Sequence, residues 1–296
     1  MEIFELKTLL KDTKYEVFID SANYVEANGN IYTDLFKIGD NDNGYFVLKI
    51  RKNDKKFVFQ SIENMLIIND ENKFINPYKD IIKRSDYVIT ISNWLNGFQP
   101  INNNKKYLSK FFSLLGYFNK QNIVKGPYTS MYVDGNYFES IDELVKWEIN
   151  NHFKYIQNFN EMHRIVEILN FLKTGLQCII LEDLNTGNLF ITDNGEYKII
   201  DTEWMIKGLN LYQFEKLNYF TFDENKWYNI TEEAKECYTV YFEALGIKKK
   251  LANEQIRTFE LLQVLRTNSY KRSFFIDNEE ILRGQIDKIM NQEKFI

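Results

Sequence analysis

The sequence predicts a two-lobed α+β fold, because strand-like segments fill its first third and helix-like segments fill the remainder. Residues 14–95 carry β-branched and aromatic runs that are separated by turn signals. From residue 105 onward, apolar residues recur at helical spacing. A chain of 296 residues is long enough for two lobes that share a cleft. We place the boundary near Asn96-Gly97, with a β-rich lobe at residues 1–96 and a mainly helical lobe at residues 97–296.

The composition predicts a globular, cytoplasmic protein. Hydrophobic residues make up 44% of the chain and charged residues 27%. The net charge of −5 argues against a nucleic-acid partner, because neutralising phosphates requires a basic face. The two cysteines are far apart, which argues against a disulfide framework or a zinc site. No apolar run approaches the ~20 residues that span a bilayer, and the first residues lack a signal-peptide core. We therefore expect no membrane span, and a monomer or homodimer.

Four segments of the first lobe have the pattern of strands. The Asn43-Gly44 pair tolerates the positive φ angles of a tight turn, so it predicts a hairpin between the second and third strands. Residues 56–70 predict a helix, although Phe57–Phe59 can instead extend a strand. The predicted strands are residues 14–25, 31–38, 44–52 and 86–97.

The second lobe carries helix signals in several places. Ser140, followed three residues later by Glu143, has the pattern of a capping box. Another helix is predicted to begin at an Asn160 cap and to stop at Gly175. Further predicted helices lie at residues 105–118 and over most of residues 231–293. These signals make the second lobe mainly helical.

One group of polar residues interrupts the helical pattern of the second lobe. A short apolar run, LQCIIL, predicts a buried strand that ends just before Asp183. The segment LFITDNGEYKII then predicts a hairpin that turns near Asn194, which places Asn188 opposite Ile200 and Asp201. Opposed residues of an antiparallel pair lie about 4.5–5.5 Å apart. An amide oxygen and a carboxylate suit Mg²⁺, and Asp183 would lie within reach to orient a hydroxyl and accept its proton. The alternative is a polar loop followed by an ordinary surface hairpin.

The segments LEDLNTGN and IIDTEW resemble the aminoglycoside phosphotransferase and choline kinase family, the small-molecule branch of the protein-kinase-like fold. In that family the catalytic loop reads H-G-D-x-x-x-x-N, and a hairpin leads to I-D-[WF]-E. The resemblance implies a bilobal kinase-like fold with ATP and Mg²⁺ as cofactors. It also implies that Asp183 is the catalytic residue and that Asn188 and Asp201 hold the metal.

The sequence departs from the family pattern at four positions. Leu181 stands where the family usually has His, and Glu182 where it often has Gly. Thr202 replaces the aromatic residue that follows the metal-binding Asp. Gln213 stands where an Asp is common, which bears on how the catalytic loop is supported.

The resemblance also implies nucleotide-binding residues in the first lobe. A lysine on the third strand pairs with the phosphates, and an acid on the next helix holds it. Lys49 has the matching position, with Glu63 as its natural partner. For Lys49 the alternative is a solvent-facing strand lysine, since apolar residues flank it on both sides. For Glu63 the alternative is a surface glutamate.

Two loops complete the predicted nucleotide site. Gly29 and Asn30 lie where a phosphate-covering loop would run, and their backbone N–H groups can donate to phosphate. A plain hairpin turn is the alternative. Trp94 lies where the hinge would meet the adenine, and a core aromatic is its alternative.

The function that these features predict is transfer of the γ-phosphate of ATP to a hydroxyl of a small molecule. Aminoalcohols, aminoglycosides, sugars and glycan precursors are the acceptor classes that the resemblance implies. Acids and aromatics around the site, Tyr212 among them, can bind an ammonium group or can simply pack the core. A nucleotide-binding pseudokinase or regulatory module without turnover is the competing interpretation. A protein kinase is disfavoured, because no A-P-E-like anchor follows Asp201.

Overall fold

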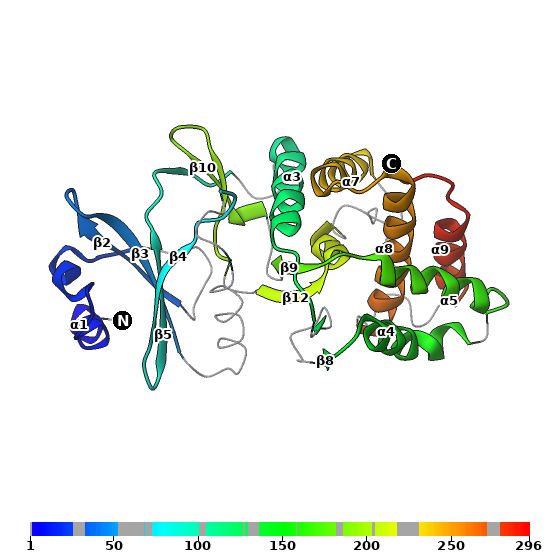
Figure 1. Ribbon diagram of the computed structural model, residues 1–296, viewed down its shortest axis with the longest axis horizontal. Coiled ribbons are helices and arrows are strands. Elements are labelled where there is room, and N and C mark those ends of the chain that lie inside the picture. The colour runs from blue at the N-terminus through cyan, green and yellow to red at the C-terminus, as the bar shows by residue number, and fades with distance from the viewer. Residues whose placement is uncertain are drawn as a thin grey trace. The chain divides into compact units, whose positions relative to one another are not determined.

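The computed structural model describes residues 2–25, 33–52, 68, 73–100, 105–126, 128–129, 136–157, 159–181, 186–202, 205–217, 231–270 and 279–296 (Figure 1). The chain forms two compact units, which are described one at a time. Unit 1 comprises Met1–Gln99 and Asn188–Trp204, and unit 2 comprises Pro100–Gly187 and Met205–Ile296. The predicted α+β class is confirmed. The predicted division into lobes at residues 1–96 and 97–296 stays a prediction.

Unit 1 is built on a five-stranded antiparallel sheet with the strand order β1-β2-β3-β5-β4 (Figure 1). The predicted hairpin is present, because Asp40 pairs with Gly44 and Gly44 has a φ of +81°. Glycine adopts this left-handed conformation without steric cost. The strands are β1 (Asn23–Tyr24), β2 (Thr33–Asp40), β3 (Gly44–Lys52), β4 (Tyr78–Lys83) and β5 (Tyr87–Asn93).

The core of unit 1 lies against one face of this sheet. Helix α1 (Ile3–Leu10), the 3₁₀ helix η1 (Glu16–Ser21) and the residue just before η1 contribute four buried residues to it: Leu6, Leu10, Tyr15 and Ile19. The prediction of a strand over residues 14–25 is therefore wrong for most of that segment, which is strand only at β1. Tyr15, at the N-cap of η1, and Ile19, within it, are both buried in this core, and this packing outweighs strand propensity.

A second, three-stranded sheet in unit 1 has the order β11-β10-β6. Strands β10 (Leu189–Thr192) and β11 (Tyr197–Ile199) form the predicted hairpin, and Gly195 takes a φ of +79° in its turn. Strand β6 (Gly97–Phe98) pairs with β10 so closely that a Cβ on Gly97 would lie 2.1 Å from the carbonyl oxygen of Ile191. On the other side of the hairpin, Ile75 forms a parallel bridge with Ile199.

Unit 2 is mainly helical, as predicted. Helices α3 (Lys105–Gln121) and α7 (Glu232–Leu245) pack side by side (Figure 1). A Cβ on Gly116 would lie 2.5 Å from the carbonyl oxygen of Tyr241, so the lack of a side chain permits this close approach. A two-stranded sheet of β9 (Gln177–Leu181) and β12 (Met205–Leu209) accompanies the helices.

The remaining elements of unit 2 largely follow the sequence signals. The Ser140 hydroxyl accepts from the backbone N–H of Glu143 and caps α4, as predicted. Helix α5 begins after Glu161 without a side-chain cap, so the expected Asn160 cap is wrong. The elements are α4 (Ile141–Ile156), α5 (Met162–Asn170), α8 (Lys249–Tyr270), α9 (Glu279–Asn291), η2 (Phe171–Thr174), η4 (Asn210–Leu217), β7 (Tyr128–Thr129) and β8 (Tyr137–Phe138). The short η3 (Thr186–Asn188) begins in unit 2, and its last residue belongs to unit 1.

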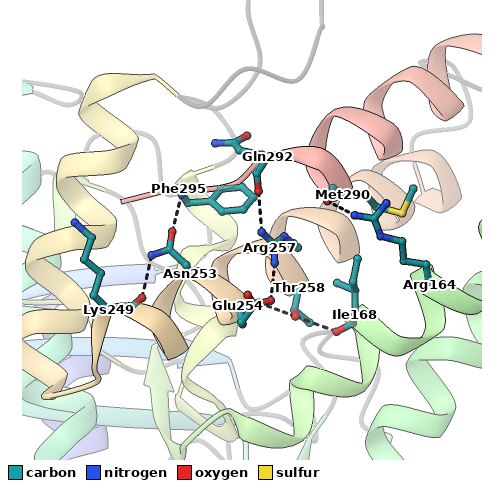
Figure 2. A network of polar contacts seen from close by, with 10 residues as sticks. All are labelled: Arg164, Ile168, Lys249, Asn253, Glu254, Arg257, Thr258, Met290, Gln292 and Phe295. Carbon is teal, nitrogen blue, oxygen red and sulfur yellow. Dashed lines mark hydrogen bonds and ion pairs between the residues drawn. The ribbon is translucent and has the colours of Figure 1, made fainter.

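Helix α8 is buried along most of its length and joins several parts of unit 2 (Figure 2). The Thr258 hydroxyl donates to the carbonyl oxygen of Ile168 in α5 at 3.0 Å. The Asn253 amide oxygen accepts from the backbone N–H of Phe295 at 2.6 Å, which fixes the end of the chain. Among the described residues, no helix combines the length and apolarity that a membrane crossing requires.

Candidate active site

The β10–β11 hairpin brings Asn188 and Asp201 to the same end of its ladder. Leu189 pairs with Ile199, and the backbone N–H of Ile200 donates to the carbonyl oxygen of Asn188 at 2.8 Å. Asn188 therefore opposes Ile200, and Asp201 follows directly. This is the register predicted from the Asn194-Gly195 turn, and it places an amide and a carboxylate beside the ends of neighbouring strands.

Asp201 has a φ of +58°, in the left-handed region that side chains rarely adopt. Aspartate tolerates this conformation better than most residues, because its short polar side chain can bond locally. Strand β11 ends at Ile199, two positions before Asp201, and the Asp201 carboxylate contacts the first sheet. Its Oδ1 accepts from the ammonium of Lys49 at 2.5 Å. The Lys49 side chain is 12% exposed and the Asp201 side chain 38% exposed.

Strand β3 determines the face on which Lys49 lies. Its neighbours Leu48 and Ile50 are buried in the core beside α1 and η1. Since successive side chains of a strand alternate in direction, Lys49 belongs to the opposite face. There it pairs with Leu35 of β2 and Thr90 of β5. Lys49 is thus on the face that the Asp201 carboxylate contacts. The sequence does not predict the ion pair between Lys49 and Asp201.

Two buried hydroxyls accompany this ion pair. Thr90 is directly across the sheet from Lys49, and Thr202 follows Asp201 in the chain. They are 7% and 2% exposed, and within the described part of the chain neither hydroxyl oxygen has a hydrogen-bond partner. Buried polar groups are nearly always bonded, so a ligand or an ordered water is expected to satisfy them. Sequence reasoning identified Thr202 as a departure from the family but attached no role to Thr90.

Trp94 follows β5 on the Lys49 side of the sheet. Its backbone N–H donates to the carbonyl oxygen of Tyr45 at 2.8 Å, and its indole N–H donates to the amide oxygen of Asn96 at 3.0 Å. The ammonium of Lys37 lies 4.5 Å from the Trp94 ring centroid and 4.3 Å from that of Tyr45. These are cation–π distances. Lys37 was not predicted, although its position on β2 shares the face of Lys49 by strand alternation.

The donor set is compatible with Mg²⁺. Asn188 is buried and offers an amide oxygen, while Asp201 offers a carboxylate. Mg²⁺ is usually held by one or two carboxylates together with substrate phosphates, so a complete protein cage is not required. The described ranges contain no cluster of three His, Cys, Asp or Glu residues suited to a metal. The Lys49 ammonium shows that a cation is stabilised beside Asp201.

Four predicted site residues lie outside the described residues. They are Asp183, Glu63, Gly29 and Asn30, so their predicted roles stay predictions. The four that are described, Lys49, Trp94, Asn188 and Asp201, all belong to unit 1.

Tyr212, one of the aromatics considered for the acceptor, packs inside unit 2. It is 3% exposed, and its hydroxyl donates to the Glu148 carboxylate at 3.0 Å. Burial, together with the negative charge of Glu148, raises the pKa of Tyr212 well above its ordinary value. The guanidinium of Arg266 pairs with Glu148 and lies 5.0 Å from the Tyr212 ring. The ring already has a cation partner, so Tyr212 belongs to a buried ionic cluster.

Comparisons with known proteins identify the fold. No protein-family model matches the sequence, and no curated protein matches it either. An ethanolamine kinase of Plasmodium vivax is similar in structure, with 14% identity, 99% of this chain and 84% of that chain covered, and a TM-score of 0.58.

Two aminoglycoside phosphotransferases are also similar. The enzyme APH(4)-Ia has 13% identity, 97% of each chain covered and a TM-score of 0.52. The enzyme of Alicyclobacillus acidocaldarius has 11% identity, 90% of this chain and 89% of that chain covered, and a TM-score of 0.51. The chain therefore has the kinase-like fold of these proteins, and the predicted fold is confirmed.

Proposed function

We propose that this chain, which has the fold of small-molecule kinases, is an ATP-dependent phosphotransferase that acts on a hydroxyl of a small molecule with Mg²⁺. The observation that supports it most is the contact between the Lys49 ammonium and the Asp201 carboxylate, next to the buried Asn188. These groups supply one cation for phosphates and two oxygen donors for a metal, which phosphoryl transfer requires.

Lys49 binds the phosphates in this proposal. It projects from the middle of β3, whose neighbouring residues are fixed in the core, so its position needs little reorganisation. Its ammonium has three donors and can exchange the Asp201 carboxylate for phosphate oxygens. Asn188 and Asp201 would then hold Mg²⁺ through the amide and carboxylate oxygens. The bound ion supplies positive charge that neutralises the phosphates.

Asp183 orients the acceptor hydroxyl and takes its proton. This role comes from the resemblance of LEDLNTGN to the family's catalytic loop. Trp94 contacts the base, since it follows β5 on the Lys49 face of the sheet. Glu63, Gly29 and Asn30 complete the nucleotide site as the sequence predicts.

The acceptor classes are aminoalcohols, aminoglycosides, sugars and glycan precursors. Two similar proteins support the first two classes, because one is an ethanolamine kinase and APH(4)-Ia has been solved with AMP-PNP and hygromycin B. We expect one such compound to be phosphorylated at a hydroxyl.

The test is transfer of ³²P from Mg·[γ-³²P]ATP to a panel containing ethanolamine, choline, hygromycin B and simple sugars. Asp183→Asn is measured beside wild type, and Asp193→Asn serves as a matched control, because Asp193 is an exposed residue of the β10–β11 turn. Labelling that disappears in Asp183→Asn but persists in Asp193→Asn is the expected result. Binding of ATP without any transfer or hydrolysis would instead indicate a nucleotide-binding module without turnover.

A further inference from the structure

Strand β9 is followed directly by residues 182–185. Its outer edge, the edge opposite β12, is hydrogen-bonded by groups that are not part of a strand. Its inner edge pairs with β12, where Leu181 opposes Met205. Alternate residues of an antiparallel strand direct both backbone groups away from the partner. At Ile179, the backbone N–H donates to the carbonyl oxygen of Asn122, and the carbonyl oxygen accepts from the Asn119 amide at 2.8 Å. The last pair of outward groups belongs to Leu181.

Gln213 bonds both of these groups. Its Nε2 donates to the carbonyl oxygen of Leu181 at 3.0 Å, and its Oε1 accepts from the Leu181 backbone N–H at 3.1 Å. The primary amide thus takes the place of a peptide unit in a neighbouring strand. Gln213 is 3% exposed, so neither bond has water as a ready substitute.

A second amide stabilises Gln213. Asn119 is fully buried, and its Nδ2 lies 3.5 Å from the Gln213 Oε1. The Tyr241 hydroxyl donates to the Asn119 Oδ1 at 2.6 Å, which sets the orientation of that amide. Helices α3 and α7 and the 3₁₀ helix η4 therefore converge on the end of β9.

We propose that Gln213 is a positioning residue for Asp183, acting through Leu181. This inference rests on the proposed function, since it gives Asp183 the catalytic role. Leu181 lies two positions before Asp183 in the chain, so fixing both backbone groups of Leu181 fixes the direction in which the chain leaves β9. Displacement of a reacting group by about 1 Å costs about a hundredfold in rate. A neutral amide can hold both groups because it donates and accepts at once, whereas a carboxylate only accepts.

The first test compares Gln213→Met with Gln255→Met. Methionine keeps the length of the side chain but loses both bonds. Gln255 is a matched control, because it is fully buried in the same unit and its Nε2 donates to the carbonyl oxygen of Thr174 at 2.7 Å. We expect both variants to lower the melting temperature, whereas only Gln213→Met lowers kcat, by roughly a hundredfold. The KM for ATP should change less than about twofold, because the described nucleotide residues belong to unit 1.

The second test uses Gln213→Glu, which keeps the shape of the side chain. A protonated glutamic acid donates and accepts as glutamine does, while the ionised form faces the Leu181 carbonyl with a negative charge. Burial raises the pKa of such an acid, so it ionises as the pH rises from 6 to 9. We expect the ratio of its kcat to that of wild type to fall by about tenfold over this range, at temperatures where both stay folded.

Neighbouring groups do not produce this profile. Among the described residues, the titratable groups of the surrounding network are Tyr212 beside the Glu148–Arg266 pair, Tyr241, and Cys178 of β9. Burial raises the pKa of the Tyr212 and Tyr241 hydroxyls and of the Cys178 thiol, so these three stay protonated in the range.

Hydrogen exchange separates this inference from the proposed function. Gln213→Met should speed exchange of the Leu181 amide at least tenfold, and Gln255→Met should not. Unchanged exchange, or a kcat equal to that of Gln255→Met, would overturn the positioning role while leaving the kinase proposal standing. A wild-type protein that turns over no ATP would overturn the kinase proposal and, with it, the positioning role of Gln213.

Discussion

The ammonium of Lys49 lies 2.5 Å from Oδ1 of Asp201, although 152 residues separate the two in the chain. The contact connects the middle of β3 with the residue that follows the β10–β11 hairpin, all within unit 1. A cation therefore already lies beside the carboxylate that would hold a metal. In the proposed site, a metal would compete with this ion pair for Asp201 until phosphates attracted Lys49.

Replacing Lys49 by Met is predicted to separate metal binding from nucleotide binding. Without the competing ammonium, Asp201 should bind Mn²⁺ more tightly in the absence of nucleotide, while transfer from ATP should fall by at least about a hundredfold. Electron paramagnetic resonance of free Mn²⁺ measures the first effect, and labelling of acceptor measures the second. Lys52→Met is the control, since Lys52 is exposed at the end of the same strand. Equal Mn²⁺ affinity in wild type and Lys49→Met would contradict a competing role for the lysine.

Replacing Asn188 by Leu is predicted to weaken metal binding specifically. Leucine has a similar volume but no oxygen donor, and the backbone carbonyl that bonds Ile200 is unaffected. The Mg²⁺ concentration for half-maximal rate should rise by at least about tenfold, as for other losses of metal-site groups. A magnesium titration of the rate measures this. Asn194→Ala, in the turn at the other end of the hairpin, should leave the titration unchanged.

Removing the Trp94 ring is predicted to weaken ATP binding. Stacking of a base on an aromatic ring is worth about 1–3 kcal/mol, which corresponds to at least a several-fold rise in Kd for Trp94→Ala. Calorimetric titration with a non-hydrolysable ATP analogue measures the affinity. Tyr24→Ala tests the specificity of the effect, because Tyr24 is an exposed aromatic of the same sheet. Identical affinities in the two variants would exclude Trp94 from the base site.

The buried pair of Glu148 and Arg266 is predicted to be costly to break. The two side chains are 1% and 2% exposed, so Arg266→Met leaves an unpaired buried carboxylate and should lower the free energy of unfolding by about 3–5 kcal/mol. The double variant that also carries Glu148→Leu should recover much of this loss. Urea unfolding measures both. Lys235→Met, which breaks an exposed pair with Glu232, should cost less than about 1 kcal/mol.

The Asp40 carboxylate is predicted to make the first hairpin sensitive to acid. Its Oδ1 accepts from the backbone N–H of Asn43 at 2.7 Å, and this bond is the main cause of a pKa below the ordinary value of 3.8. A lowered pKa contributes stability that is complete above the ordinary value and is lost as the pH falls through the folded-state value. The stability difference between wild type and Asp40→Asn should therefore shrink from pH 6 to pH 3 in urea unfolding. A constant difference would contradict the assignment.

The local parts of the site were predictable from the sequence. The hairpin that places Asn188 opposite Ile200 depends on the Asn194-Gly195 turn and on the alternation of its two strands, which are short-range signals. The face of Lys49 was not predictable, since apolar residues flank it on both sides. Burial of Leu48 and Ile50 by α1 and η1 settles it, and that burial is a tertiary contact.

Other features depend on residues far apart in the chain. The segment over residues 14–21 is apolar enough for a strand, and only its packing makes it helical. The bonds between Gln213 and Leu181 join residues 32 positions apart, so no periodicity predicts them. The Lys49–Asp201 contact is of the same kind. The sequence pattern predicts which residues bear on the chemistry, whereas the partners of these residues required the fold.

Unit 1 is assembled from two separate stretches of chain, and this limits how the protein can be divided. A fragment ending at residue 99 would lack β10, the partner of β6, and β11, which bonds the Phe74–Asn76 segment. A synthetic peptide spanning residues 188–204 should then restore such a fragment by complementation. Exchange of unit 1 between homologous chains would succeed only if both of its stretches were exchanged together. Unit 1 is therefore a module of the folded structure, although no single continuous segment of the gene encodes it.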